Sequence, residues 1–225
     1  ELEKIELEYK KALYNIPNLP KDDVKVGKND SENDVVRKVG EVPKFGFEPK
    51  DHLQLGEKLG IIDVERAVKV SGARFNYLKG DGVLLELALV NFAIETLMKE
   101  GFIPVIPPVL IKKESMSGMG YLEHGGEEDM YTLPRDNMVL VGTSEQSIGP
   151  MHAGEILDVT KPIRYVGFSP CFRREAGSYG KDTRGILRVH QFDKIEMFSF
   201  THPDNSDEEH EFLLSLEEKF LHALG

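Results

Sequence analysis

Two long stretches of alternating apolar and polar residues, about 163–175 and 187–200, flank a loop that contains Gly177, Gly180 and Gly185. Alternation with a period of two is typical of strands that have one buried face, and glycines permit a tight reversal between them. The pattern predicts a long antiparallel hairpin. A chain built around such a hairpin must cover one of its faces with other elements.

Apolar periodicity predicts helices on both sides of the hairpin. Residues 83–100 are apolar on more than one side, and burial inside one domain or against a second subunit would explain this equally well. In the last helix Ser206 and Glu209 fit a capping box, and the inner face is formed by Phe212, Leu213, Leu216, Phe220 and Leu224. Shorter helices are expected at 49–60, after Asp63 and at 144–157, with a strand at 138–142 and a proline-broken strand at 102–111. The expected fold is an antiparallel sheet covered by helices.

The N-terminal part differs in texture from the rest. Residues 1–14 repeat apolar positions at spacings of three and four, which predicts a helix. Because this helix starts without a cap, it is interpreted as the end of a longer one, and a short terminal helix packed on the body is the alternative. Residues 15–49 contain four prolines and form an expected extended linker, so 50–225 is the expected main domain.

Composition excludes several classes of protein. The chain has 225 residues, a formal net charge of −11 and one cysteine, Cys171. This charge argues against a uniformly basic surface that coats DNA, and a single thiol cannot form an internal disulfide or a multi-thiolate zinc site. No apolar stretch is long enough for a bilayer span and no leader opens the chain, so we expect a cytoplasmic protein without a membrane partner.

The basic residues gather at the hairpin, although the familiar nucleotide and metal motifs are missing from the sequence. Between 173 and 188 five basic residues outnumber two acidic ones, which suggests an anionic ligand: Arg173, Arg174, Lys181, Arg184 and Arg188, against Glu175 and Asp182. Alternation puts Arg173 and Glu175 on one face of the first strand. It likewise puts Arg188, Phe192 and Glu196 on one face of the second. Solvated ion pairs, a mobile loop and a core phenylalanine would explain these features one by one, but together they favour a nucleotide site.

The segment CFRREAGSYGKDTRGILRVHQFDKIE, from Cys171 to Glu196, resembles the second signature motif of class II aminoacyl-tRNA synthetases in its seryl-tRNA synthetase form. Four further segments resemble the same family: GARFNYLKG at 72–80, GFIPVIPP at 101–108, GTSE at 142–145 followed by HAGEIL at 152–157, and IPNLP at 16–20. The resemblance covers nearly the whole chain. After GTSE the chain continues with QSIGP, where the family commonly has an apolar or proline-containing continuation.

The resemblance implies an α+β fold: a class II synthetase-like antiparallel sheet flanked by helices, incomplete, with the end of an N-terminal helical arm. It implies a homodimer formed through the 83–111 region. It also implies ATP-dependent activation of L-serine to seryl-adenylate, with Mg²⁺ accompanying ATP, followed by transfer to tRNA(Ser).

The resemblance also implies roles for individual residues. Arg173 would bridge the serine carboxylate and the α-phosphate of ATP, and Thr143, Ser144, Glu145 and Glu196 would bind serine. ATP would be bound by Arg173, Arg174, Glu175, Arg188, Val189 and Phe192, with Glu175 and Val189 reading the adenine edge, Phe192 stacking on the ring and Arg188 meeting the outer phosphates. No general base is needed, because the serine carboxylate is ionised at neutral pH.

The third signature motif of the family, the metal-binding glutamate before it and most of the arm are not in this sequence, and no metal ligand is expected within it. We therefore expect a piece of a longer enzyme that adenylates poorly by itself. Two alternatives are an amino acid:carrier-protein ligase, which would use cysteine in a zinc-centred site, and a catalytically silent paralogue that acts as a binding module.

Overall fold

The computed structural model describes residues 1–122, 126–176 and 185–225. Its central sheet has the order β3-β7-β8, formed by β3 (Ile103–Val105), β7 (Ile163–Phe172) and β8 (Gln191–Phe200). β7 and β8 pair antiparallel, with Cys171 opposite Phe192 and Gly167 opposite Glu196, whereas β3 runs parallel to β7. The predicted hairpin is confirmed. Its loop residues Gly177, Gly180, Lys181, Asp182 and Arg184 lie outside the described ranges.

Both hairpin strands are shorter than the alternation predicted. β7 ends at Phe172 rather than at 175, and β8 begins at Gln191 rather than at 187. Three residues after β7 ends, Glu175 adopts a left-handed conformation with φ of +52°, which a regular strand does not accommodate. Arg173, Glu175 and Arg188 therefore lie beyond the strand ends, and strand alternation does not determine where their side chains point.

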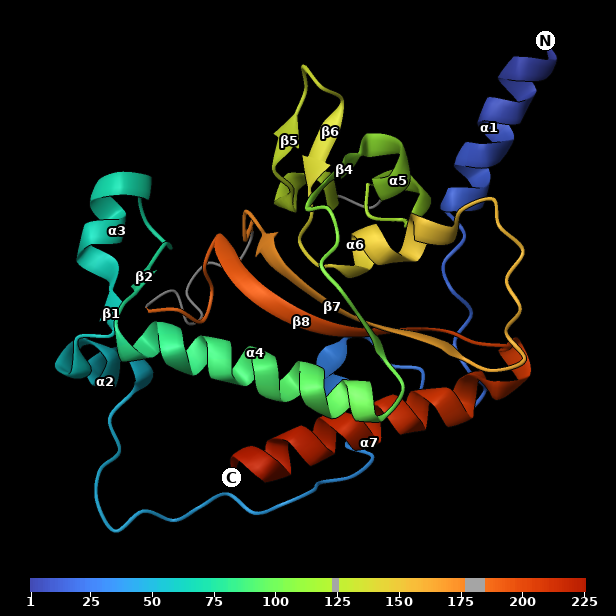
Figure 1. Cartoon of the computed structure of the whole chain (residues 1–225). Coiled ribbons are helices and arrows are strands. Elements are labelled where there is room, and N and C mark those ends of the chain that lie inside the picture. The colour runs from blue at the N-terminus through green and yellow to red at the C-terminus, as the bar shows by residue number, and fades with distance from the viewer. Residues whose placement is uncertain (123–125, 177–184) are drawn as a thin grey trace.

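Two long helices, α4 (Asp81–Lys99) and α7 (Ser206–Leu224), lie along one side of the hairpin, and the short helix α6 (Glu145–Ile148) lies on the other (Figure 1). The core between sheet and long helices consists of Leu97, Phe102, Val166 and Leu216, with Ile195, Met197, Phe212, Leu213 and Phe220 packed against it. The predicted inner face of the last helix is thus confirmed except for Leu224, which is 58% exposed.

The predicted capping box at the start of α7 is wrong. The helix begins at Ser206, after the 3₁₀ turn η4 (Pro203–Asn205), and no side chain caps its first turn. Glu209 turns instead toward the sheet. Its carboxylate accepts two hydrogen bonds of 2.6 Å from Arg164 and one of 2.8 Å from Ser199. A buried carboxylate gains more from a guanidinium than from a backbone N–H, and this determines its direction.

A second, smaller sheet packs beside α6. It has the order β4-β6-β5, formed by β4 (Leu110–Lys112), β6 (Met138–Leu140) and β5 (Thr132–Leu133), with α5 (Lys113–Gly118) and the 3₁₀ turn η2 (Gly126–Asp129) next to it. Its core contains Ile111, Met116, Met130, Val139 and Val141. The predicted strand at 102–111 is therefore divided between two sheets, because Pro107 and Pro108 interrupt it.

The helix predicted at 144–157 is also much shorter than expected. α6 is followed by the 3₁₀ turn η3 (Gly149–His152), which has Pro150 in its first turn. Proline lacks the N–H that would continue an α-helical ladder, and Gly154 then takes φ of +82°. The chain thus changes direction after one turn of helix, so that α6 is a short helix packed against the sheet.

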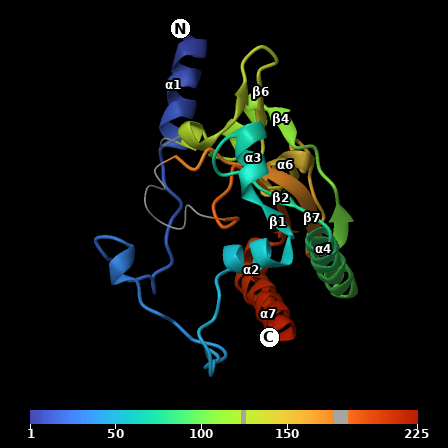
Figure 2. The same cartoon turned by 90° about the vertical axis from the view of Figure 1, so that its left-hand side faces the viewer.

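The N-terminal region consists of α1 (Leu2–Tyr14) and a long segment with one 3₁₀ turn, η1 (Asp30–Glu32), and residues 1–51 are all exposed (Figure 2). Ion pairs tie this segment to α7, among them Arg37 to Glu218 at 2.6 Å. α2 (His52–Leu59), β1 (Ile62–Asp63), α3 (Val64–Ser71) and β2 (Tyr77–Leu78) follow. Asp63 caps α3 as predicted, accepting from the Arg66 N–H at 3.0 Å. No helix in the described ranges is both long and apolar enough to cross a bilayer.

Candidate active site

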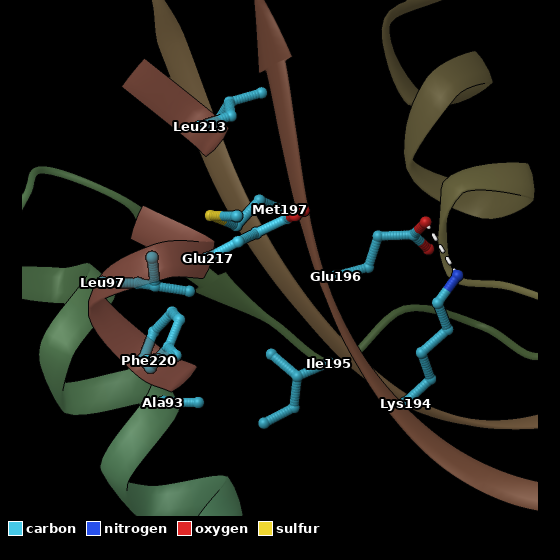
Figure 3. Close-up of a pocket in the computed structure, with 9 residues that line it drawn as sticks. All are labelled: Ala93, Leu97, Lys194, Ile195, Glu196, Met197, Leu213, Glu217 and Phe220. Carbon is cyan, nitrogen blue, oxygen red and sulfur yellow. Dashed lines mark hydrogen bonds and ion pairs between the residues drawn. The ribbon is translucent and has the colours of Figure 1, made fainter. Parts of the chain in front are cut away.

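Side chains of β8 alternate between two environments (Figure 3). Ile195 and Met197 point toward α4 and α7, whereas Lys194 and Glu196 point to the opposite side, toward α6. Phe192 shares the second face because side chains in a strand repeat every two residues. One face of β8 therefore builds the core, and the other brings a ring, an ammonium group and a carboxylate together.

The carboxylate of Glu196 is the centre of this second face. One oxygen accepts hydrogen bonds from the hydroxyl of Thr143, from the hydroxyl of Ser144 at 3.2 Å and from the backbone N–H of Glu145 at 3.2 Å. The other oxygen accepts from the Lys194 ammonium at 2.9 Å. The residues predicted to bind serine, Thr143, Ser144, Glu145 and Glu196, are thus brought into one cluster.

A glycine in β7 allows α6 to approach the sheet this closely. A Cβ atom at Gly167 would lie 2.6 Å from the Ser144 hydroxyl oxygen, closer than such atoms pack. Gly167 is also the residue paired with Glu196 in the neighbouring strand. Its missing side chain therefore leaves the space in which Thr143 and Ser144 reach the Glu196 carboxylate.

The pKa of Glu196 reflects two opposing effects. Burial alone would raise it, because a low-dielectric surrounding disfavours the ionised form. The hydrogen bonds from Thr143 and Lys194 stabilise the carboxylate and outweigh burial, so that the pKa of Glu196 lies below its ordinary value. Glu196 is therefore an anion at neutral pH, and it orients the Thr143 hydroxyl by accepting its hydrogen bond.

Arg173 lines a cavity of about 290 Å³ next to this cluster. Its Nε donates to the Gly142 carbonyl at 3.0 Å, and its guanidinium carbon lies 5.4 Å from the centre of the Phe192 ring. The cavity is also lined by Tyr121, Asp129, Thr143, Glu145, Gln146 and Lys194. Arg173, the predicted ligand of the serine carboxylate, thus lies next to two other predicted ligands. These are Glu145, for the serine ammonium group, and Phe192, for the adenine ring.

The remaining predicted residues lie at the base of the hairpin loop. Arg188 and Glu175 form an ion pair at 3.5 Å, in which the Glu175 side chain is 14% exposed and that of Arg188 44%. Arg174 turns the other way, with its guanidinium carbon 5.7 Å from the centre of the Tyr131 ring. Val189 is buried and lines a second cavity, of about 470 Å³, together with Phe192.

Sequence reasoning missed three residues of this site. Lys194 donates hydrogen bonds to both Thr143 and Glu196. It lies two residues from each of Phe192 and Glu196, so strand alternation could have placed it on the same face as these residues. The Tyr121 hydroxyl donates to Glu145 at 2.9 Å, and the side-chain amide oxygen of Gln146 accepts from the Gly142 N–H at 2.8 Å. Nothing in the local pattern around Tyr121 indicates this contact, since it joins separate elements.

Metal-binding residues do not cluster in the described ranges. Within them, no group of three or more His, Cys, Asp or Glu side chains is placed to hold an ion. Cys171 is buried in β7, with its sulfur 3.7 Å from the Ser169 hydroxyl oxygen, and it does not line the cavity next to Arg173.

Comparison with known proteins gives a consistent result. Residues 131–225 match the family described as the tRNA synthetase class II core domain (G, H, P, S and T). The serine–tRNA ligase of Acidothermus cellulolyticus is 54% identical over 216 residues, which are 96% of this chain and 51% of that protein. The enzyme of Thermobifida fusca is 53% identical over 223 residues. The chain spans about half the length of the curated relatives that it matches.

Solved structures show the same likeness. Seryl-tRNA synthetase from Pyrococcus horikoshii, crystallised with ATP, superposes with a TM-score of 0.91 at 38% identity and matches 98% of this chain. The cytoplasmic serine–tRNA ligase of Naegleria fowleri, in complex with AMP, gives a TM-score of 0.89 at 37% identity. Each match covers 54% of the solved chain. The α+β fold and the family resemblance inferred from the sequence are thereby confirmed.

Proposed function

This chain is homologous to seryl-tRNA synthetases over about half of their length. We propose from this that it carries out ATP-dependent activation of L-serine as part of a serine–tRNA ligase. An oxygen of the serine carboxylate attacks the α-phosphorus of ATP. The new C–O–P linkage forms as the bond to the β-phosphate breaks, and pyrophosphate leaves. A terminal hydroxyl of tRNA(Ser) then attacks the seryl carbonyl, and AMP leaves.

The observation that carries this proposal is the position of Arg173 between the Thr143–Glu145 cluster and the ring of Phe192. During activation two anions, a carboxylate and a triphosphate, must approach each other. A preorganised guanidinium between them offsets their repulsion and stabilises the charge that develops on the α-phosphate. The bond from its Nε to the Gly142 carbonyl holds Arg173 in place and leaves its terminal nitrogens for the substrates.

Serine would be held by its ammonium group and recognised by its hydroxyl. In the proposal, Glu145 and Thr143 receive the ammonium group, and Glu196 acts on the substrate directly or through Thr143 and Ser144. Lys194 balances the negative charge of Glu196. Alanine would be rejected because it would leave buried polar groups of such a site without a partner.

ATP would use the hairpin base. Phe192 stacks on adenine, Glu175 and the backbone at Val189 read its edge, and Arg188 meets the outer phosphates, with Arg174 as a further ligand in the same proposal. Arg188 would then exchange its exposed ion pair with Glu175 for phosphate oxygens, a stronger bidentate partner. Mg²⁺ would enter with ATP as part of the substrate.

We further propose a homodimer formed through residues 83–111. Large apolar side chains of α4 lie in solvent, including Leu84 (63% exposed) and Leu87 (51%), and Ile106 of the same region is 82% exposed. Apolar patches of this extent are typical of protein interfaces. In the same proposal α1 is the end of an arm that contacts tRNA, 15–49 a linker and 50–225 part of the catalytic domain, in a cytoplasmic enzyme.

The structure offers little support for the two alternatives. A carrier-protein ligase with a zinc-centred site would need Cys171 at the cavity, but this thiol is buried beside Ser169. A catalytically silent paralogue would not need the hydrogen bonds of Glu196, or an Arg173 side chain that lines the neighbouring cavity. The activation reaction therefore accounts for more of the observed contacts.

A nonhydrolysable seryl-adenylate analogue, a seryl sulfamoyl adenosine, tests the proposal. At 100 times its dissociation constant it should raise the Tm of the chain by roughly 5–10 °C. The alanyl analogue is the matched ligand, and Arg173→Ala is the matched variant. Failure of the seryl analogue to raise the Tm, or an equal shift with the alanyl one, would contradict the proposal.

A further inference from the structure

The segment 72–76, between α3 and β2, contains an unusual backbone conformation. Arg74 takes φ of +62°, in the left-handed region that side chains other than glycine seldom adopt. Such conformations persist only where surrounding contacts impose them, and they often occur at functional sites. The contacts of Arg74 show what holds this residue in place.

Arg74 bonds both arms of the hairpin loop at once. Its guanidinium donates to the backbone carbonyl of Glu175 at 3.2 Å, on the arm that leaves β7. Its own backbone carbonyl accepts from the His190 N–H at 2.9 Å, on the arm that enters β8. Both contacts depend on the left-handed turn, because it directs the carbonyl and the side chain of one residue toward the hairpin.

The two arms are also bonded to each other at this point. The Arg173 N–H donates to the His190 carbonyl at 3.0 Å, and His190 Nδ1 lies 2.9 Å from the Arg173 carbonyl oxygen. The rings of Phe75 and His190 are 5.3 Å apart, so the residue after Arg74 packs on the same histidine. Segment 72–76 thus contacts both arms at the base of the hairpin loop, where the arms are also hydrogen-bonded to each other.

These arms carry the proposed ATP ligands. Glu175, whose carbonyl accepts the hydrogen bond from Arg74, itself has φ of +52°, so one left-handed residue holds the backbone of another. Its side chain pairs with Arg188 on the opposite arm. A shift of the Glu175 backbone would therefore move both groups that are proposed to read adenine and phosphate.

We propose that Arg74 is a positioning residue for ATP binding: it preorganises the arms that present Arg173, Glu175 and Arg188 without itself touching substrate. This inference rests on the proposed function. Preorganisation strengthens binding because the arms need not be ordered when the ligand arrives.

Arg74→Gly provides a sharp test, because it removes the guanidinium but favours the left-handed backbone. ATP affinity, measured by calorimetry with Mg²⁺, should fall about tenfold, because the arms lose the anchoring hydrogen bond from Arg74 to the Glu175 carbonyl. The Tm should change little. Amide exchange should become faster in 173–176 and 188–190. Asn137→Gly is the matched control, since Asn137 is also left-handed (φ of +53°) but lies at the β5–β6 turn.

The outcomes separate this inference from the function on which it rests. Unchanged ATP affinity in Arg74→Gly, with a wild-type chain that binds ATP, would overturn the positioning role alone. Equal losses in Arg74→Gly and Asn137→Gly would overturn it as well, since the effect would then be general. A wild-type chain that does not bind ATP would overturn the proposed function, and the positioning role for ATP with it, whatever the exchange rates of the arms in Arg74→Gly.

Discussion

The phenol of Tyr121 donates a hydrogen bond of 2.9 Å to the carboxylate of Glu145, inside the cavity that Arg173 lines. Burial, and then the hydrogen bond to Glu145, raise the pKa of Tyr121 to about 12, so the phenol keeps its proton at neutral pH. A donor that stays protonated fixes the direction of the carboxylate proposed to receive the ammonium group.

Tyr121→Phe should therefore weaken recognition of the amino group rather than of the nucleotide. We expect affinity for the seryl-adenylate analogue to fall about 3- to 10-fold, because Glu145 loses one orienting hydrogen bond. ATP affinity should stay within twofold of wild type. Calorimetric titration of both ligands distinguishes these effects, and an equal loss for both would contradict the assignment of Glu145 to the ammonium group.

Glu196→Gln should change the pH dependence of stability. The folded pKa of Glu196 lies below its ordinary value, so this carboxylate stabilises the fold above the ordinary pKa. That contribution is lost as the pH falls through the lowered, folded pKa. The wild-type urea midpoint should thus fall more steeply than that of Glu196→Gln between pH 6 and pH 3. Parallel curves would show that the pKa of Glu196 is not lowered in the folded state.

Gly142→Ala should displace Arg173. A Cβ atom at Gly142 would lie 3.3 Å from Cγ of Arg173, tight enough to shift that flexible side chain by a few tenths of an ångström. We expect about tenfold weaker binding of the seryl-adenylate analogue with little change in Tm, because misplacement of a catalytic group is costly.

Gly118→Ala is the matched control, since a Cβ atom there meets nothing within 4 Å. It should leave binding of the analogue unchanged. An effect of equal size in both variants would exclude displacement of Arg173 as the cause.

Removing one partner of the Arg164–Glu209 ion pair should destabilise the fold more than replacing both partners with apolar residues. Both hydrogen bonds are 2.6 Å long, and the Arg164 guanidinium lies 4.0 Å from the Phe212 ring centre. Glu209→Ala should lower the free energy of unfolding by about 2–3 kcal/mol, because it leaves a half-buried guanidinium without its carboxylate partner. The double variant Arg164→Met, Glu209→Leu should recover most of the loss. Additive losses in urea titrations would argue against this account.

Leu84→Glu should prevent self-association. Leu84 is 63% exposed on α4, so the variant should fold normally, whereas a buried glutamate in a dimer interface would be costly. Sedimentation velocity should detect a dimer for the wild-type chain and a monomer for the variant. Val70→Glu, at a residue 72% exposed on α3, is the control and should remain dimeric. A monomeric wild-type chain at micromolar concentration would contradict the proposal.

Features determined by local pattern were predictable from the sequence. The hairpin, the helix over 83–100 and the apolar face of the last helix all follow from periodicity, which records which side of an element is buried. The clustering of Thr143 with Glu196 was expected only through the family resemblance. Neither residue stands close to the other in sequence, and no local signal links them.

Features decided by contacts between distant segments were not predictable. Alternation continues past Phe172, but the strand ends there, and Glu175 beyond it is left-handed and bonded to Arg74, from a segment 101 residues earlier. Glu209 fits a capping box locally, and it bonds Arg164 instead because the tertiary fold offers a guanidinium. The Tyr121–Glu145 bond likewise depends on packing that periodicity does not record.

The parallel pairing of β3 with β7 has a consequence for how the molecule assembles. Ile103 pairs with Tyr165, and the whole of the second sheet and α6 lie between these two residues in the sequence. By contrast, β7 and β8 are consecutive strands joined by one loop. Closing a short loop costs less chain entropy, so the hairpin can form early in folding and β3 must dock later. We therefore expect the strands that carry the proposed ligand-binding groups to form first and the remaining layers to pack onto them later.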